Sequence, residues 1–207
     1  EHCADPLCDS DGDRGDFLTE TGFVPKARYM MRALELAAQA AAMGEVPVGA
    51  VVVQKSTGRI IGEGYNRREA DRSPLAHAEI MAIDAASRTL GGWRLLDSAL
   101  YVTLEPCPMC AGAILHARLE QVVYGTADPK GGAVDSVEQL FTLPYNWTPE
   151  VHAGLLQAEC AQILRDFFRD LRLKKQAEKI ARKPLGRFII LAVVLLMMMG
   201  TLLTTLY

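Results

Sequence analysis

The distribution of apolar residues predicts alternating helices and strands between Pro25 and about Gln176. Apolar residues recur at helical spacing after Pro25, and Gly44 ends this first helix. Residues 46–53 form an apolar, β-branched run typical of a buried strand, and residues 59–65 read as its hairpin partner.

The same patterns continue along the rest of this region. They predict a helix from near His77, a strand at 99–104, a helix at 109–117, a strand at 121–126, a Gly-rich loop at 128–135, a short strand at 150–155 and a long helix from about Gln157. Strands that alternate with helices predict an α/β domain with helices on both faces of one sheet.

Both ends of the chain differ in composition from this central domain, residues 25–176. Residues 1–24 are acidic and poor in apolar residues, which predicts a disordered tail. Within residues 1–22, seven acids stand against Arg14 alone, so this stretch carries −6 while the whole chain carries −3. The remainder is therefore positive, and a weakly acidic total does not exclude a nucleic-acid partner. Residues 177–187 are predicted to form a basic linker.

The last segment, residues 188–207, contains no charged residue. As a helix it would span about 30 Å, the thickness of the hydrocarbon core of a bilayer. The basic residues that precede it are expected on the cytoplasmic side. The segment is thus a candidate C-terminal membrane anchor. The alternatives are that it is foreign to this protein or fills the domain's own core.

The cysteines point to a reducing compartment. Five cysteines, unevenly spaced, are too few for a disulfide scaffold in a domain of this size. The acidic N-terminal stretch also lacks the apolar region of a signal peptide. We therefore expect a cytoplasmic protein.

Two short segments carry residues suited to metal chemistry. They are His77-Ala78-Glu79 and Pro106-Cys107-Pro108-Met109-Cys110, with 27 residues between Glu79 and Cys107. One imidazole and two thiolates supply three ligands to a tetrahedral Zn²⁺ and leave the fourth position to water. Glu79 follows the histidine closely enough to reach that water without binding the metal. This H-x-E…P-C-x-x-C arrangement is the signature of the zinc nucleobase deaminases.

The chemistry follows from the residue types. Zn²⁺ lowers the pKa of a bound water towards ~7 and so produces hydroxide at neutral pH. Both segments precede predicted helices, whose positive dipole ends favour the thiolate forms of Cys107 and Cys110. Glu79 can take the proton of the water and deliver it to a ring nitrogen and then to the departing amine.

Longer stretches around these motifs resemble the bacterial tRNA-specific adenosine deaminases (TadA type) of the cytidine/deoxycytidylate deaminase superfamily. The resemblance begins near Arg28, runs to about Lys175, and is carried by segments 46–51, 62–66, 77–83, 101–114, 123–125 and 167–169. The zinc motif is shared with cytidine, deoxycytidylate, riboflavin-pathway and guanine deaminases, so the flanking segments carry the assignment to tRNA.

The resemblance implies a fold, a reaction and two partners. The fold is a three-layer αβα, cytidine-deaminase-like arrangement with a mixed sheet of about five strands. The reaction is hydrolytic conversion of the wobble adenosine of tRNA to inosine, with one Zn²⁺ per subunit. The partners are the anticodon stem-loop of tRNA and a second copy of the chain in a homodimer.

The resemblance also assigns residues to the substrate. Asn66 matches an asparagine that hydrogen-bonds the purine, although a turn residue after a strand explains it equally well. Asp128 matches a loop acid close to the ribose, although an Asp before Pro129 also suits a plain turn. The residues expected to line the rest of the pocket are Val48, Ala78 and Pro106.

The end of the last predicted helix matches the place where this family meets RNA. The residues concerned are Phe168, Arg169, Arg172, Lys174 and Lys175. A solvated charged face is the alternative. Phe167 and Phe168 both suit the core, and stacking of one of them on an unpaired base is the other interpretation.

Two other functions stay open at this point. One is deamination of free guanine or another free base or nucleotide, which requires a closed pocket instead of an open groove. The other is a membrane-anchored binding module with a structural zinc, whose fourth ligand would be Cys160, His116 or His152.

Overall fold

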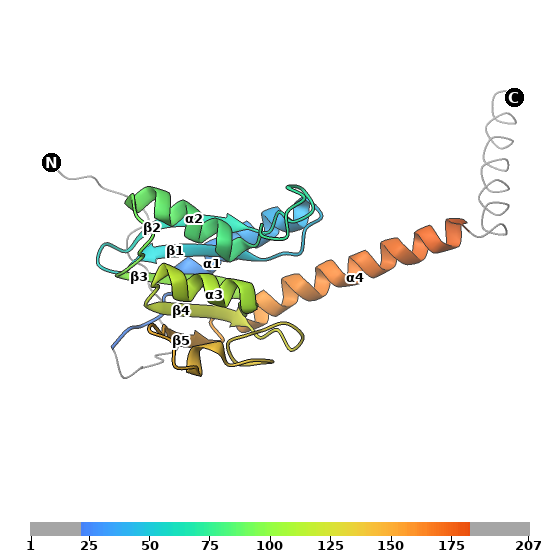
Figure 1. Cartoon of the computed structure of the whole chain (residues 1–207). Coiled ribbons are helices and arrows are strands. Elements are labelled where there is room, and N and C mark those ends of the chain that lie inside the picture. Colours follow the sequence, from blue (N-terminus) through green and yellow to red (C-terminus); the bar gives the residue numbers. More distant parts are fainter. Residues whose placement is uncertain (1–21, 183–207) are drawn as a thin grey trace, which may run out of the picture.

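The computed structural model describes residues 22–182 and contains one five-stranded sheet with helices on both of its faces (Figure 1). The α/β class predicted from the alternating pattern is confirmed. In chain order the elements are α1 (Ala27–Ala42), β1 (Gly49–Gln54), β2 (Arg59–Tyr65), α2 (Ala78–Leu90), β3 (Ser98–Leu104), α3 (Pro108–Ala117), β4 (Gln121–Thr126), the short 3-10 helix η1 (Leu140–Thr142), β5 (Glu150–Ala153) and α4 (Gln157–Arg182).

The sheet is mixed, with the strand order β2-β1-β3-β4-β5. Strand β1 is antiparallel to both β2 and β3, so β2 and β3 run in the same direction. Strands β3, β4 and β5 are parallel, and α3 makes the crossover between β3 and β4. A mixed sheet of about five strands is what the family resemblance implied.

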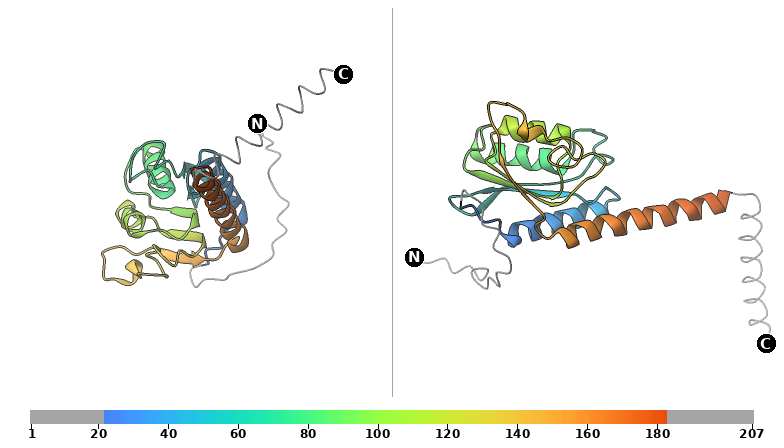
Figure 2. Two further views of the ribbon diagram at one scale, coloured as in Figure 1. Left: turned by 90° about the vertical axis from the view of Figure 1, so that its right-hand side faces the viewer. Right: turned by 90° about the horizontal axis from the view of Figure 1, so that it is seen from below.

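The helices form two layers. Helices α1 and α4 pack on one face of the sheet, and α2 and α3 pack on the other (Figure 2). Two separate apolar cores result, one on each face of the sheet. The protein is therefore built as the three-layer αβα arrangement that was expected.

Helix α2 approaches the sheet closely because β2 carries glycines where the helix crosses it. A Cβ atom at Gly62 would lie 2.2 Å from the carbonyl oxygen of Ala82, and one at Gly64 would lie 2.3 Å from that of Ala78. Only hydrogen atoms fit in this space. The first turn of α2, and with it His77, is thereby fixed against the end of β2.

Some boundaries differ from those predicted. The first strand begins at Gly49 and not at residue 46, because Pro47 has no N–H to donate to a sheet. The fifth strand ends at Ala153, before Gly154 with its positive φ of 89°. Helix α4 runs to Arg182, so residues 177–182 of the predicted linker are helical.

Two predictions concern residues that lie largely outside the described range, namely the acidic tail and the apolar segment 188–207. At the edge of the tail, the Phe23 ring packs 5.1 Å from that of His152, so the folded domain begins before Pro25. Within residues 22–182, no helix combines the length and apolar character needed to cross a bilayer.

Candidate active site

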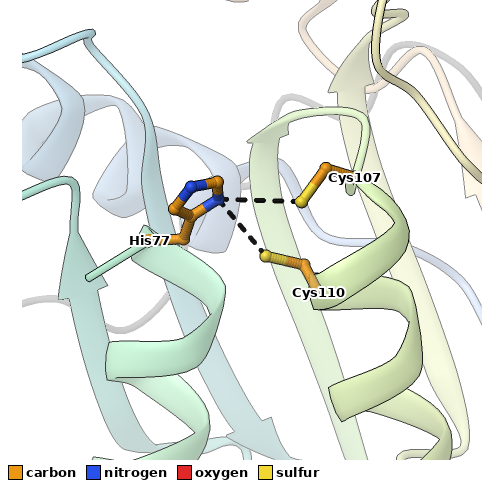
Figure 3. Close-up of side chains that lie close together, drawn as sticks. All are labelled: His77, Cys107 and Cys110. Atoms are coloured by element: carbon orange, nitrogen blue, oxygen red, sulfur yellow. Dashed lines mark hydrogen bonds between the residues drawn. The ribbon is translucent and has the colours of Figure 1, made fainter. Parts of the chain in front are cut away.

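The metal-ligand candidates lie at the beginnings of two helices on the same face of the sheet. His77 is the N-cap residue of α2, Cys107 is the N-cap residue of α3, and Cys110 lies in the first turn of α3 (Figure 3). Helix α2 follows β2 and helix α3 follows β3. Because β2 and β3 run in the same direction, both helices begin at one edge of the sheet and bring the two sequence segments together.

The three ligand atoms are spaced for one metal ion. The Nδ1 atom of His77 lies 3.7 Å from Sγ of Cys107 and 3.5 Å from Sγ of Cys110. All three atoms lie within 4.8 Å of one another. Zn–S bonds of about 2.3 Å and Zn–N bonds of about 2.1 Å in a tetrahedron separate ligand atoms by roughly 3.6 to 3.8 Å. The residues present therefore fit a tetrahedral ion.

No fourth protein ligand joins this group within residues 22–182. Cys160 is buried in the core between the sheet and helices α1 and α4, on the opposite face of the sheet. A ring nitrogen of His152 forms a 2.7 Å hydrogen bond with Gln121. His116 is exposed near the end of α3. The structural-zinc alternative thus finds none of its three candidate fourth ligands at the site.

The two thiols share a proton unequally. A hydrogen bond from Cys110 is the largest cause that lowers the pKa of Cys107, to about 4, and the imidazole of His77 also stabilises this thiolate. The pKa of Cys110 is raised, first by the same hydrogen bond and then by burial. Without a metal, Cys107 is therefore the sulfur that ionises more readily. A metal that binds both sulfurs displaces the remaining proton.

Glu79 lies in the first turn of α2, with only 4% of its surface exposed. Burial is the main cause that raises the pKa of its carboxyl to about 7, and the nearby Cys107 thiolate adds to this effect. A carboxyl group with a pKa near neutrality can both accept and release a proton at physiological pH. This is the property required of the residue predicted to shuttle protons.

Asn66 is hydrogen-bonded to two segments that lie far apart in the sequence. Its side chain accepts a 3.1 Å hydrogen bond from the backbone N–H of Ala78 and donates a 3.1 Å bond to the carbonyl of Val46. Its own backbone N–H donates to the carbonyl of Val48. Asn66, Val48 and Ala78 are all buried beside His77. Contact of these residues with a substrate stays a prediction.

Pro106 and Asp128 are the two predicted pocket residues that contact the loop after β4 or lie within it. Pro106 is buried, and its carbonyl accepts a 2.9 Å hydrogen bond from Ala133. The side chain of Asp128 accepts a 3.0 Å hydrogen bond from the backbone N–H of Lys130. The geometry of Asp128 is therefore that of the turn residue predicted as the alternative, and a contact with ribose stays a prediction.

Two buried glutamates that the sequence reading missed hold the loops on either side of the ligands. Glu45 accepts hydrogen bonds of 2.9 and 2.8 Å from the backbone N–H groups of Glu69 and Ala70, in the loop that leads to His77. Glu105, two residues before Cys107, accepts hydrogen bonds from four backbone N–H groups and one hydroxyl; the donors are Asp128, Val134, Asp135 and Ser136. The sequence did contain a signal for Glu105. It is a charged residue between a buried strand and a proline, and a Gly-rich loop follows later in the chain.

The predicted RNA-contact residues lie on α4, on the sheet face opposite α2 and α3. Phe168 is 40% exposed, and Arg169, Arg172, Lys174 and Lys175 are exposed as well. Phe167 is half-buried and packs edge-on against Phe168, with 5.4 Å between ring centres. The phenylalanines thus differ: Phe167 faces the domain and Phe168 faces solvent.

Comparison with known proteins agrees with this geometry. Residues 24–172 match the family model of the MafB19-like deaminases. The chain is 48% identical over 159 residues to the tRNA-specific adenosine deaminase of Bacillus subtilis, an alignment that covers 76% of this chain and 96% of the relative. The chain belongs to the tRNA-specific adenosine deaminase family. The Haemophilus influenzae member is 49% identical over 160 residues, covering 77% of this chain and 92% of that protein.

Solved structures support membership of the tRNA-specific adenosine deaminase family. One, from a study of A-to-I editing by wobble-position tRNA deaminases, has a TM-score of 0.65 and 45% identity, covering 67% of this chain and all of that chain. The guanine deaminase of Nitrosomonas europaea is more distant, with a TM-score of 0.57 and 28% identity over 70% of this chain and 85% of that chain. The resemblance inferred from the sequence is confirmed, and so is the cytidine-deaminase-like fold.

Proposed function

We propose that the protein catalyses zinc-dependent hydrolytic deamination of adenosine to inosine at the wobble position of tRNA. The observation that carries this proposal is the convergence of His77, Cys107 and Cys110 beside the buried carboxyl of Glu79. Three protein ligands and an adjacent proton shuttle are the requirements of a hydrolytic deaminase site. The names of the curated relatives support adenosine in tRNA as the substrate.

Each residue at the site has a chemical role. His77, Cys107 and Cys110 would hold Zn²⁺, which supplies a Lewis acid that makes a water molecule acidic. Glu79 accepts one proton of the attacking water and transfers it to a nitrogen of the purine ring. It then accepts the second proton from the new hydroxyl group on the ring carbon and passes it to the amine as the carbon–nitrogen bond breaks. Burial of Glu79 suits this sequence because its carboxyl has a pKa of about 7 and changes its protonation state readily.

Asn66 is proposed to orient the purine. Its Nδ2 atom carries two hydrogens, of which the carbonyl of Val46 accepts one. The other hydrogen is available to an acceptor on the base. Val48, Ala78 and Pro106 would bound the base, and Asp128 would lie towards the ribose.

We propose that the protein acts as a homodimer. A groove of about 400 Å³ runs along the outer side of α3, the helix that carries Cys110, and its lining includes Pro108, Leu115 and Tyr145. Tyr145 is 50% exposed. We assign this groove, which lies on the same helix as Cys110, to the partner subunit. Sedimentation of the wild-type protein and of the Tyr145→Arg variant tests this assignment, and a monomeric wild-type protein would refute it.

We propose that the exposed end of α4 contacts the phosphates of the RNA, with Phe168 as a stacking surface.

For the cellular setting, we propose a cytoplasmic catalytic domain, tethered to a membrane by residues 188–207. Lys183 and Arg187 would then lie at the lipid headgroups. Catalysis does not require this tether.

The test of the function is direct measurement of inosine. Metal-loaded protein is incubated with an anticodon stem-loop RNA that carries adenosine at the wobble position, and the product nucleosides are quantified. Activity on this RNA should fall as salt rises, because phosphate contacts release counterions. Free guanine is the second candidate substrate because the Nitrosomonas europaea guanine deaminase has a similar fold. Turnover of guanine without turnover of RNA would move the assignment to that activity.

A further inference from the structure

The distal half of α4, defined here as residues 171–182, forms a basic arm outside the candidate metal site, and it includes three of the residues proposed to contact RNA. Helix α4 projects beyond the rest of the domain (Figures 1 and 2). Every residue from 172 to 181 is exposed. The arm carries five basic residues against Glu178 alone, a net charge of +4; they are Arg172, Lys174, Lys175, Lys179 and Arg182.

Within the part of the chain whose side chains are described, four basic residues of this arm form no ion pair, namely Arg172, Lys174, Lys175 and Lys179. In the preceding turns, Arg169 pairs with Asp166 at 2.7 Å and with Asp170 at 3.5 Å. Beyond them, no ion pair involves Lys174 or Lys175 within residues 22–182. A helix with uncompensated positive charge attracts a polyanion.

The chain carries such a polyanion itself. Residues 1–21 contain seven acids and one base, a net charge of −6. The point where this segment joins the domain lies beside the base of α4. Phe23 packs 5.1 Å from the ring of His152 on β5, and it shares a core with Leu155 and Leu156, which immediately precede α4.

The acidic segment is long enough to reach the arm. Helix α4 has 26 residues, which corresponds to a length of about 39 Å at 1.5 Å per residue. A stretch of 21 residues can span up to about 70 Å when extended. Because the segment is covalently attached, its effective concentration at the arm is in the millimolar range, which favours it over a separate polyanion.

We propose that residues 1–21 dock on the basic arm of α4 and compete there with RNA. The docking depends on no other assignment, whereas the competition rests on the proposed RNA substrate. Exposed ion pairs are individually weak and are screened by salt, so the contact forms at low ionic strength and is released as salt rises. The segment would then weaken RNA binding most under the conditions that favour nonspecific binding.

The contact is tested on the full chain by zero-length carbodiimide crosslinking, which joins carboxyl groups to lysines. Mass spectrometry of the digested product should find crosslinks between acids of residues 1–21 and Lys174, Lys175 or Lys179 at ~20 mM salt, and far fewer at ~500 mM. A variant with the substitutions Lys174→Gln, Lys175→Gln and Lys179→Gln should lose them. If the products that have the mass of a single chain contain no crosslink between residues 1–21 and the basic arm at low salt, the proposal is overturned.

The competition is tested by fluorescence anisotropy with a labelled anticodon stem-loop RNA. Reversal of two tail charges in an Asp9→Lys, Asp11→Lys variant should lower the Kd roughly fivefold at low salt. The matched control is a Glu35→Lys, Asp84→Lys variant, which makes the same change in net charge on exposed positions of α1 and α2. An equal effect in both variants would overturn the competition.

The two experiments separate this inference from the proposed function. Crosslinks in a protein that produces no inosine from RNA would refute the tRNA substrate and leave the docking intact. Normal inosine production without crosslinks would refute the docking and leave the tRNA substrate intact.

Discussion

The carboxylate of Glu105 accepts a 2.9 Å hydrogen bond from the backbone N–H of Asp128. Through this bond, and those from residues 134–136, one buried side chain holds the loop after β4 against the strand end that leads to Cys107. The loop packs closely against this carboxylate, because a Cβ atom at Gly132 would lie 2.2 Å from the Glu105 carboxyl carbon. The loop beside the candidate metal centre is thus positioned by an acid that need not touch the substrate.

Replacement of Glu105 by Gln should lower the free energy of unfolding by about 2 to 3 kcal/mol, because a buried charge with several donors becomes an amide that cannot accept all of their bonds. Denaturant unfolding of the metal-loaded protein measures this loss. Glu35→Gln, an exposed change on α1, is the control and should shift stability by less than about 0.5 kcal/mol. Equal stability of the two variants would contradict the role assigned to Glu105.

The Glu105 carboxylate should also make the stability of the folded protein fall at acid pH. Burial alone would raise the pKa of Glu105, but the hydrogen bonds from Ser136, Asp135 and Asp128 outweigh burial and hold this pKa below its usual value. A group whose pKa is lowered by folding stabilises the protein above its unfolded pKa, near 4.3, and loses that contribution as pH falls through its folded pKa. Below pH ~4.5 the wild-type protein should therefore lose stability more steeply than Glu105→Gln. Parallel stability curves for the two proteins would contradict this.

Glu79 and Cys107 should separate catalysis from metal binding. Glu79→Ala removes only the proton shuttle, so the variant should keep its metal and its fold while deamination falls by at least about 10²-fold. Cys107→Ser removes a ligand, so metal content and thermal stability should fall together with activity, because metal binding is linked to folding. Metal analysis, thermal unfolding and inosine measurement on the same samples test both statements. Near-normal deamination by Glu79→Ala would show that another group moves the proton.

Two glycines should respond to alanine in opposite ways. In Gly64→Ala the new Cβ would lie 2.3 Å from the carbonyl oxygen of Ala78, which forces α2 away from β2 and displaces His77. We expect a loss of several kcal/mol in unfolding free energy, together with weaker metal binding. Gly112 lies within α3 with nothing within 4 Å of its Cβ position, so Gly112→Ala should stabilise the folded chain by about 0.5 to 1 kcal/mol. Thermal unfolding of both variants decides the matter, and tolerance of Gly64→Ala would refute the close approach of α2.

The fold was predictable where local patterns and topology agree. Apolar runs gave the strands, and the ligand motif gave the metal residues, because both signals are contiguous in the sequence. The convergence of His77 with Cys107 depends on the parallel directions of β2 and β3, which no local pattern encodes. The roles of Glu45 and Glu105 were missed for the same reason, since their donors lie 23 to 31 residues away. Asn66 was seen as a purine contact or a turn residue, whereas its amide also bridges two backbone segments.

The apolar segment 188–207 should act as a membrane tail that catalysis does not need. It contains eleven Leu, Ile, Val or Phe residues and no charge. Each contributes roughly −0.3 to −0.6 kcal/mol at a helix centre, so their sum is at most about −3 to −7 kcal/mol in favour of insertion. Removal of residues 184–207 should abolish cosedimentation with phospholipid vesicles and leave metal content and deamination unchanged. The full chain with Leu195→Lys, a central charge that costs roughly 2.5 to 3.5 kcal/mol, should bind vesicles far more weakly. Unfolding or metal loss in the truncated protein would show instead that the segment packs into the domain, because a separate tail contributes nothing to the core.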